Sequence, residues 1–366
     1  MRVIAVANQK GGCGKTTTSI NFASSLAFLQ KSCLLIDWDP QGHATCGLGI
    51  KLEDSPRNLY ELISPYHEKK PSVDELLCPV EPNLWLIPAY GVLGALEEEL
   101  ANLPGKEKRL RETLEIIQKE KPELEYVVID CPPNLGVLTL NAMDAADEIF
   151  IPIEPSFFSL HGLAKMSETL QEINKHRPDP IEIRALLTIF DSRTCFAQEV
   201  YQEVKDHFKD SLFKTIIHES VLLKEAAGAG KSIVKYDQES GAAKDYLNLA
   251  FEYLEKEWDR LLPPQRLGWS NVMNQLYGPR LVSGGVLFQA VSKNARGVEI
   301  AGDFNHWIPE PLLRRGFEGL WQKVIPITKG VFRYKFIVDG EWQLDPYQPL
   351  QQVNAYGTFD SYLELV

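Results

Sequence analysis

The stretch NQKGGCGKTTTS, Asn8–Ser19, decides how the first part of the chain folds. Its glycines let backbone N–H groups turn toward a bound anion, and a helical pattern begins directly after them. The apolar run RVIAVAN precedes it, so the local order is strand, glycine-rich loop and helix. This order indicates a phosphate-binding loop, in which Lys15 neutralises phosphate charge and Thr16 offers its hydroxyl to Mg²⁺. The alternative is a glycine-rich turn with two solvated lysines.

A second lysine, Lys10, stands near the start of the loop, where an ordinary phosphate loop needs none. The pattern Lys-Gly-Gly-x-Gly-Lys-Thr-Thr resembles the deviant Walker A motif of the ParA/Soj/MinD partition and positioning ATPases. In that family the early lysine reaches the phosphates bound by a second subunit. The resemblance therefore implies an ATP-dependent homodimer with two nucleotides between its subunits. A cation supplied in trans would stabilise charge on the γ-phosphate and couple hydrolysis to dimerisation.

Two further stretches extend the resemblance, which covers roughly residues 1–257. In CLLIDWDPQGHAT the resemblance implies that Asp37 lies near Mg²⁺ and that Asp39 orients the attacking water. In VVIDCPPNLG, which resembles the family's Walker B motif, it implies that Asp130 holds a Mg²⁺-bound water. The competing explanation is that these carboxylates, each after an apolar strand, only cap helices or turns. The resemblance implies ATP and Mg²⁺ as cofactors, with Lys10, Lys15 and Asp39 as catalytic residues and Thr16 and Asp130 at the metal. The implied nucleotide-binding set is Gly11, Gly12, Cys13, Gly14, Lys15, Thr16, Thr17, Asp37 and Asp130.

The stretch HESVLLKEA, residues 218–226, departs from the family pattern. Soj-type proteins place DNA-binding arginines there and in a later segment, but here Glu219, Leu222, Glu239 and Gly241 take those places. Loss of these cations removes favourable counterion release, so we regard non-specific DNA binding as doubtful. The cations that remain nearby form either a weak patch or an ordinary solvated face: Arg193, Lys224, Lys231, Lys235 and Lys244. His218 and Ser220 also replace the proline and asparagine that contact the base in the family.

The composition limits the classes of protein that the chain can represent. Its net charge is −12, and residues 1–260 hold 28 Lys and Arg against 41 Asp and Glu, which disfavours nucleic acid as a partner. The six cysteines form no Cys-x-x-Cys pair, as is typical of reduced intracellular thiols. The apolar runs are too short to cross a membrane, and MRVIAVAN is not a secretion signal. The Tyr246–Trp258 segment is amphipathic but ends acidic, unlike the basic membrane-binding helix of the MinD branch. We expect a cytoplasmic protein without a membrane partner.

The first 260 residues alternate apolar runs with helical patterns, which predicts a doubly wound, mostly parallel α/β sheet. The expected strands are RVIAVAN, SCLLIDWD, LWLIPA, EYVVIDCPP, EIFIPIEP, EIRALLTIF and LFKTIIH, and examples of the expected helices are Thr16–Leu29, Leu160–Lys175 and Ala197–Phe208. Residues 261–283 contain paired prolines and glycines with no clear period, and we predict a linker. Residues 284–366 contain short alternating strands, which predict a small immunoglobulin-like β-sandwich. The expected strands there are GVLFQAV, GVEIAGDF, LWQKVIPI, GVFRYKFIVDG, EWQLD and SYLELV.

Three stretches of the C-terminal part occur in one order: VEIAGDFNHW, FRYKFIVDGEWQLDP and NAYGTFDSYLEL. They resemble the glycogen-binding module of the AMP-activated kinase β subunit and carbohydrate-binding module family 48. The resemblance implies that Trp307 and Trp342 are platforms for glucose rings, because an indole covers the flat C–H face of a sugar. It also implies hydrogen bonds from Lys335 and Thr358, and a residue, here Tyr356, at the curve of the glucan. Asp360 replaces a sugar-binding asparagine.

The functional hypothesis is an ATP-dependent dimerisation switch that hydrolyses ATP slowly until an activating protein stimulates it. Its C-terminal module would bind glycogen or another α-glucan, so the protein would position or sense glucan. One alternative is a DNA-partition ATPase whose β-sandwich binds a protein partner, because related modules keep the fold without binding sugar. Another is a non-enzymatic scaffold locked in one nucleotide state.

Overall fold

The computed structural model divides the chain into two compact units, Met1–Leu261 and Leu262–Val366. Each unit is described by itself. The described residues are 1–51, 57–66, 70–89, 91–100, 103–156, 169–170, 172–175, 177, 179–261, 278–282, 284–292, 295–315, 319–348, 350–354 and 356–365.

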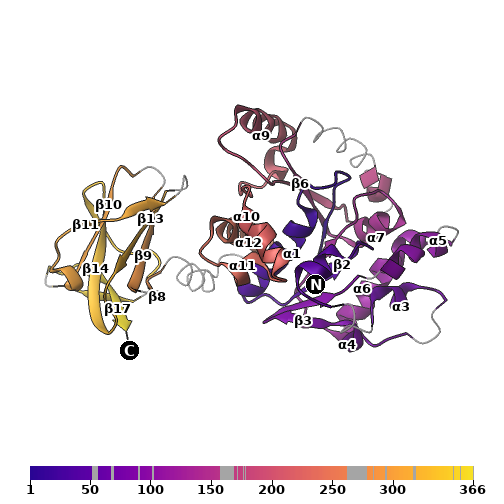
Figure 1. The fold of residues 1–366 in the computed structure, drawn as a ribbon, viewed down its shortest axis with the longest axis horizontal. Coiled ribbons are helices and arrows are strands. Elements are labelled where there is room, and N and C mark those ends of the chain that lie inside the picture. Colours follow the sequence, from indigo (N-terminus) through magenta and orange to yellow (C-terminus); the bar gives the residue numbers. More distant parts are fainter. Residues whose placement is uncertain are drawn as a thin grey trace. The chain divides into compact units, whose positions relative to one another are not determined.

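The first unit is built on a seven-stranded sheet in the order β3-β4-β2-β5-β1-β6-β7 (Figure 1). All neighbouring strands are parallel except the edge pair β3 and β4. Valine, isoleucine and leucine bury both faces of the central strands, as a sheet covered by helices requires. The predicted doubly wound α/β fold is confirmed. The strands are β1 (Arg2–Val6), β2 (Cys33–Asp37), β3 (Cys78–Glu81), β4 (Leu84–Ile87), β5 (Tyr126–Asp130), β6 (Glu148–Ile153) and β7 (Glu182–Leu187).

Helices cover the sheet, and the first and last of them, α1 and α12, pack against each other. The helices are α1 (Lys15–Phe28), α2 (His43–Gly47), α3 (Leu59–Ile63), α4 (Val73–Leu76), α5 (Ala95–Leu100), α6 (Arg109–Glu120), α7 (Val137–Ala145), α9 (Cys195–Phe208), α10 (Val221–Gly228), α11 (Ile233–Tyr236) and α12 (Gly241–Leu261). Short 3₁₀ turns are η2 (Gly91–Gly94), η3 (Lys106–Lys108) and η4 (Lys209–Ser211). Helices α1 and α9 agree with two predicted helices within two residues. Most of the predicted Leu160–Lys175 helix lies outside the described residues. No helix in the described part combines the length and apolar character needed to cross a bilayer.

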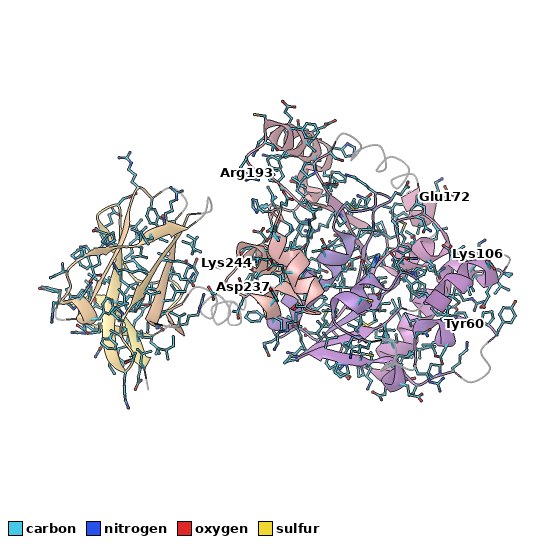
Figure 2. The ribbon with its side chains drawn as sticks, in the orientation of Figure 1. Tyr60, Lys106, Glu172, Arg193, Asp237 and Lys244 are labelled. Carbon is cyan, nitrogen blue, oxygen red and sulfur yellow. The ribbon has the colours of Figure 1, made fainter. Side chains whose placement is uncertain are left out.

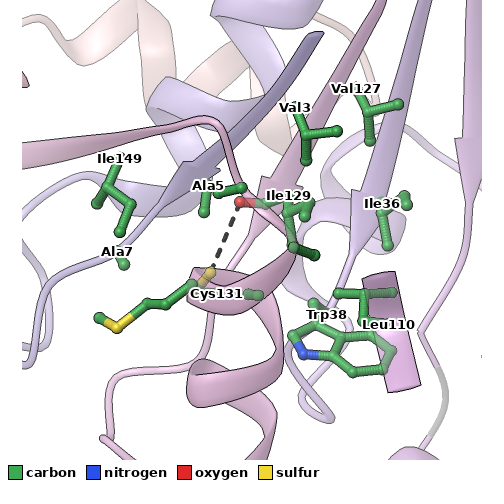
Figure 3. Close-up of a cluster of buried hydrophobic side chains, with 14 of the residues drawn as sticks. Val3, Ala5, Ala7, Ile36, Trp38, Leu110, Val127, Ile129, Cys131 and Ile149 are labelled. Carbon is green, nitrogen blue, oxygen red and sulfur yellow. Dashed lines mark hydrogen bonds between the residues drawn. The ribbon is translucent and has the colours of Figure 1, made fainter. Parts of the chain in front are cut away.

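The core of the first unit lies between the sheet and its helices. Side chains of β1, β2 and β5 form one apolar cluster with Trp38 (Figure 3). The Trp38 indole N–H donates to the Leu138 carbonyl at 2.7 Å. Elsewhere in the unit the rings of Phe22, Phe150 and Tyr253 join α1, β6 and α12, with centroids 5.0 to 5.5 Å apart. These contacts fix the positions of the carboxyl ends of β1, β2 and β5 relative to one another.

At the sheet edges, one predicted strand was wrong and one strand was not predicted. The stretch LFKTIIH, residues 212–218, forms only two isolated parallel bridges to the β7 region and no strand. The Phe213 and Ile217 N–H groups donate to carbonyls of β7, each at 2.9 Å. Between them, the N–H groups of Lys214 and Thr215 donate to the Glu252 carboxylate at 2.7 and 2.8 Å, which interrupts the ladder. The edge strand β3 was not predicted, since it has four residues and contains a proline.

The second unit consists of two antiparallel sheets, which confirms the predicted β-sandwich. One has the order β11-β10-β14-β17-β16 with β15 beside β14, and the other has the order β12-β13-β9-β8. Phe288 and Trp321 of one sheet pack with Ile300 and Phe336 of the other to form its core. The strands are β8 (Arg280–Val282), β9 (Gly285–Val291), β10 (Val298–Gly302), β11 (Glu310–Pro311), β12 (Leu313–Arg315), β13 (Leu320–Ile325), β14 (Gly330–Val338), β15 (Glu341–Gln343), β16 (Gln351–Val353) and β17 (Phe359–Leu365), with a 3₁₀ turn η5 (Asp303–Asn305). Strand β8 lies within residues 261–283, which were predicted as a linker; residues 262–277 and 283 are outside the described part.

Candidate functional site

The glycine-rich loop joins β1 to the N-terminus of α1. Gly12 and Gly14 have φ angles of 77° and 84°, which side chains rarely adopt, and a Cβ at Gly12 would project into open space. The Thr188 hydroxyl donates to the Cys13 carbonyl at 2.8 Å and fixes the loop against the end of β7. The first N–H groups of α1 are therefore presented to a cavity, an arrangement that suits an anion.

The two lysines of the loop have different surroundings. Lys15 is buried, and its Nζ donates to the Lys10 carbonyl at 3.0 Å. The Lys10 ammonium forms an ion pair with Glu154, just after β6, and donates to the Ser156 hydroxyl at 2.6 Å. Lys10 is thus held by groups of its own chain. Glu154 and Ser156 were not identified from the sequence, because they lie 144 and 146 positions away.

Asp37 and Asp130 lie side by side at the carboxyl ends of β2 and β5. Asp37 Oδ2 accepts from the backbone N–H and the hydroxyl of Thr45, each at 2.7 Å. Asp130 Oδ1 accepts from the Ser19 hydroxyl at 2.9 Å, whereas its buried Oδ2 has no hydrogen-bond partner among the described residues. Burial raises the pKa of both carboxyl groups, and the charge of Asp37 raises that of Asp130 further.

The residues present fit Mg²⁺. This ion commonly takes one or two carboxylates together with substrate phosphates and waters. The unpartnered Asp130 Oδ2 is a buried oxygen that a cation would satisfy, and the nearby Thr16 hydroxyl lowers the pKa of Asp130 against the effect of burial. Among the described residues, no three His, Cys, Asp or Glu side chains form a metal cage. A protein-only cage is not needed when phosphate supplies part of the coordination.

A cavity of about 760 Å³ opens beside the loop, within the range of small-molecule sites. It brings together these predicted site residues: Gly11, Gly12, Gly14, Lys15, Thr16, Thr17 and Asp39. Cys13, Asp37 and Asp130 are buried and do not line the cavity. Lys10 does not line it either, but its ion-pair partner Glu154 does. The lining also includes apolar side chains, among them Ile189, Ile217 and Leu223.

Two of the cations that the sequence suggested as a possible patch, Arg193 and Lys244, lie near carboxylates. The Arg193 guanidinium is paired with Asp191 at 2.7 and 2.8 Å, and Lys244 lies 3.8 Å from Glu239 (Figure 2). Lys224, Lys231 and Lys235 are exposed. Exposed ion pairs contribute little to stability, but each carboxylate repels phosphate.

Trp307 and Trp342 of the second unit lie together, with ring centroids 6.3 Å apart and planes tilted by 33°. The Trp342 side chain is 50% exposed, so its ring offers a flat apolar surface. The Trp307 indole N–H donates to the Asp303 carboxylate at 2.9 Å. The Arg333 guanidinium donates to the same carboxylate at 3.0 and 3.2 Å. Burial raises the pKa of Asp303, but these hydrogen bonds outweigh it, and the net pKa is lowered. Asp303 fixes Trp307, a role that was not predicted.

Lys335 and Asp360 lie on the same sheet face, opposite the core residues Tyr334 and Phe336. Their charged groups are 3.2 Å apart, and both side chains are largely buried. Asn354 was not identified from the sequence, although its NAYGT context is typical of a turn. Its amide N–H group donates to Thr358 Oγ1 and Asp360 Oδ1, each at 2.8 Å.

Tyr356 is 92% exposed at the tip of the hairpin that joins β16 to β17. Its backbone N–H donates to Asn354 Oδ1 at 3.0 Å, so Asn354 orders the tip as well as the polar pair. The second unit thus places the predicted sugar-binding residues on the six-stranded sheet and its loops.

The fold and the loop geometry define a P-loop protein with an appended β-sandwich. A model of an AAA domain family matches residues 1–183, and a model of the glycogen recognition site of AMP-activated protein kinase matches residues 290–366. Sporulation initiation inhibitor protein Soj of Bacillus subtilis is 40% identical over 252 residues, which are 69% of this chain and 97% of Soj. Chromosome partitioning protein ParA of Caulobacter vibrioides is 40% identical over 261 residues, 71% and 96% of the two chains.

A solved structure has a similar fold. Cobyrinic acid a,c-diamide synthase from Mycobacterium smegmatis, with bound ATP analogue and magnesium, is 28% identical with a TM-score of 0.61 and covers 72% of this chain and 98% of its own. The chain belongs to the ParA/Soj family of P-loop ATPases, and its C-terminal unit matches the glycogen-recognition family.

Proposed function

We propose that this protein is a Mg²⁺-dependent ATPase that dimerises on ATP and binds glycogen or a related α-glucan through its C-terminal unit. The observation that carries the proposal is the presence, in one chain, of a phosphate-loop cavity and of two adjacent tryptophans, Trp307 and the half-exposed Trp342, on a glycogen-recognition module. The binding of an ATP analogue and magnesium by a solved relative supports the choice of nucleotide and metal.

Each group of the proposed nucleotide site has one task. The loop N–H groups and Lys15 bind phosphate oxygens, and Thr16 with the Asp37 and Asp130 carboxylates holds Mg²⁺ and its waters. When bound, Mg²⁺ supplies positive charge to the phosphates. Asp39 accepts a hydrogen bond from the Gln41 backbone N–H at 3.0 Å and borders the cavity, so it is placed to orient a water for attack.

Lys10 is the residue that links hydrolysis to dimerisation. For its ammonium to reach the phosphates of a second subunit, it must leave Glu154 and Ser156. Phosphate carries more negative charge than one carboxylate, and this difference favours the exchange once both subunits hold ATP. The second subunit would be another copy of this chain.

Light scattering of the full chain with ATP and Mg²⁺ tests this part of the proposal. Wild type is expected to dimerise, Lys15→Ala to lose ATP binding, and Lys10→Ala to bind ATP without forming a stable dimer. Lys31→Ala, a lysine paired with Glu125 at 2.8 Å away from the loop, is the matched control. Dimerisation of Lys10→Ala equal to wild type would contradict the assigned role.

Glucan binding is supported by the geometry of the second unit. Two adjacent indoles can cover successive glucose rings, and Lys335 and Thr358 lie on the same unit as hydrogen-bonding groups. Calorimetric titration of the full chain with maltoheptaose tests the proposal. Trp342→Ala is expected to abolish measurable binding, whereas Trp85→Ala, in the first unit, is expected to leave it unchanged. If Trp342→Ala bound maltoheptaose as tightly as wild type, this face would be excluded as the glucan-binding site.

The named role of the relatives in chromosome partitioning favours a second candidate, a DNA-partition ATPase whose β-sandwich binds a protein. Arbitrary duplex DNA should then bind in an ATP-dependent manner and release steeply as salt rises. Replacement of Lys224 and Lys231 by alanine should weaken that binding. Absence of binding at low salt would exclude this candidate.

A further inference from the structure

A second cavity, of about 600 Å³, lies in the first unit and shares no lining residue with the cavity beside the phosphate loop. It is formed by η3, the first turn of α6, one side of α7 and residues 172–177. Its volume is within the range of small-molecule sites. Lys106, labelled in Figure 2, marks its position. Four of its lining side chains are cationic: Lys106, Lys108, Arg111 and Arg177.

Two of these cations, Arg111 and Arg177, meet at the C-terminal end of α7. Both guanidinium groups donate to the backbone carbonyl of Asp144, Arg111 through its Nε at 3.1 Å. Arg111 Nε also lies 2.9 Å from the Asp144 carboxylate, whose side chain is 9% exposed. Burial, and then the like charge of Arg111, lowers the pKa of Arg177. An anion placed beside the two guanidinium groups would relieve their repulsion.

Two of the carboxylates that line the cavity have partners of their own. Asp144 is paired with Arg111, and the Lys175 ammonium donates to the Glu172 carboxylate at 2.6 Å. Lys175 is exposed and does not line the cavity. The carboxylates of these two pairs are therefore partly neutralised toward a ligand.

Two cations of the lining have no carboxylate partner. In the part of the chain that the structure describes, neither Lys108 nor Arg177 forms an ion pair. Arg177 Nε donates to the Asp179 backbone carbonyl at 3.1 Å. The charges of Asp147 and Asp179 act against the lowered pKa of Arg177 but do not cancel it. Glu107 is the remaining carboxylate of the lining, so Lys108 and Arg177 leave an excess of positive charge that suits an anion.

The rest of the lining indicates which anion fits. A guanidinium binds a phosphate group through two parallel N–H bonds. Val137, Leu140 and Ile173 add apolar surface, and the cavity is much larger than a phosphate ion requires. The Glu107 carboxylate can accept hydrogen bonds from hydroxyl groups. A phosphate group on a small molecule with several hydroxyls and a carbon skeleton meets all three conditions.

We propose that this cavity is a binding site for a sugar phosphate. Arg177 and Lys108 would bind the phosphate group, and Glu107 would accept from the sugar hydroxyls. Arg111 and Asp144 would be positioning residues, because they hold the Arg177 guanidinium at the end of α7. The inference goes beyond the proposed function, since it requires neither a nucleotide nor a glucan.

Calorimetric titration of the full chain without nucleotide tests the inference. The probes are glucose 1-phosphate, glucose 6-phosphate and fructose 6-phosphate, with inorganic phosphate and glucose as the two halves of the ligand. At least one sugar phosphate should bind more tightly than either half. Arg177→Gln should weaken that binding about ten- to hundredfold, the effect of one hydrogen bond to a charged group. Lys108→Gln should weaken it by a smaller factor, because Lys108 is exposed.

Three control variants separate this cavity from the other sites of the chain. Lys119→Gln removes an exposed lysine from the last turn of α6, Lys15→Ala alters the phosphate loop, and Trp342→Ala alters the second unit. All three should bind the sugar phosphate as tightly as wild type.

Three results would overturn the inference and leave the proposed ATP binding intact. The first is that none of the sugar phosphates binds. The second is that inorganic phosphate binds as tightly as they do, which would indicate an adventitious ion only. The third is that Arg177→Gln and Lys108→Gln both bind like wild type, which would place the sugar phosphate elsewhere on the chain.

Discussion

Asp345 gives the second unit a pH-dependent stability whose size follows from the structure. Its carboxylate is buried, accepts from the Tyr334 hydroxyl at 2.5 Å, and accepts from the Tyr347 backbone N–H at 2.8 Å. Burial raises the pKa of Asp345 from 3.8 to about 6, although both hydrogen bonds favour the charged form. The native state therefore holds this proton more tightly than the unfolded state. Stability gained through Asp345 rises as pH falls through about 6 and levels off below about 4.

The whole pKa shift corresponds to about 3 kcal/mol, and about 1 kcal/mol of it falls between pH 7 and pH 5. Asp345→Asn resembles the neutral form, because its amide oxygen can still accept from the Tyr347 N–H and the Tyr334 hydroxyl can accept from its amide. At pH 7 this variant should be more stable than wild type, by about 1 to 2 kcal/mol. The advantage should shrink by about 1 kcal/mol at pH 5.

Urea unfolding of the full chain, read by hydrogen exchange of peptides from β14 and β17, reports the second unit separately. Asp339→Asn removes an exposed carboxylate of the same unit and controls for the general loss of a negative charge. A stability difference between Asp345→Asn and wild type that is constant from pH 5 to pH 7 would refute the reasoning.

Two further predictions concern the first unit. Glu148→Ala should cost about 3 to 5 kcal/mol in chemical denaturation, because it leaves the buried Arg184, now 2.7 Å from that carboxylate, without its charge partner. Adding Arg184→Met should recover much of the loss, and a loss below 1 kcal/mol for the single variant would contradict the role of the pair. Gly230→Ala should lower the free energy of unfolding by about 1 to 3 kcal/mol, since its φ is 66° and a Cβ would lie 2.7 Å from Gly49 Cα. Gly228→Ala, where a Cβ meets nothing within 4 Å, is the control, and equal effects of the two glycine variants would refute the argument.

Much of the fold could be predicted because its signals are local. The glycine-rich loop follows an apolar strand and begins a helix, and each of these features occupies only a few neighbouring residues. The alternating strands of the second unit were recognisable for the same reason. The edge strands β3 and β8 were missed because they have only four and three residues, and β3 contains a proline. LFKTIIH has strand composition, but the Glu252 carboxylate competes for its backbone N–H groups.

The partners of the site residues could not be predicted, because the fold brings them from distant parts of the chain. Glu154 and Ser156 meet Lys10 only where β6 lies beside β1. Asp245 reaches His218 from α12, and Arg333 of β14 reaches Asp303, the residue that binds Trp307. The assigned roles of the individual site residues stay predictions until variants are measured.

The central claim, that one chain couples an ATP-dependent dimer to glucan, is tested most directly by co-sedimentation with glycogen with and without Mg²⁺ and ATP. The account predicts that wild type pellets with glycogen, and more strongly with Mg²⁺ and ATP, because a dimer carries two modules. The Trp307→Ala/Trp342→Ala variant should stay in the supernatant under both conditions. If wild type does not pellet with glycogen, the account is contradicted and the DNA-partition candidate takes its place.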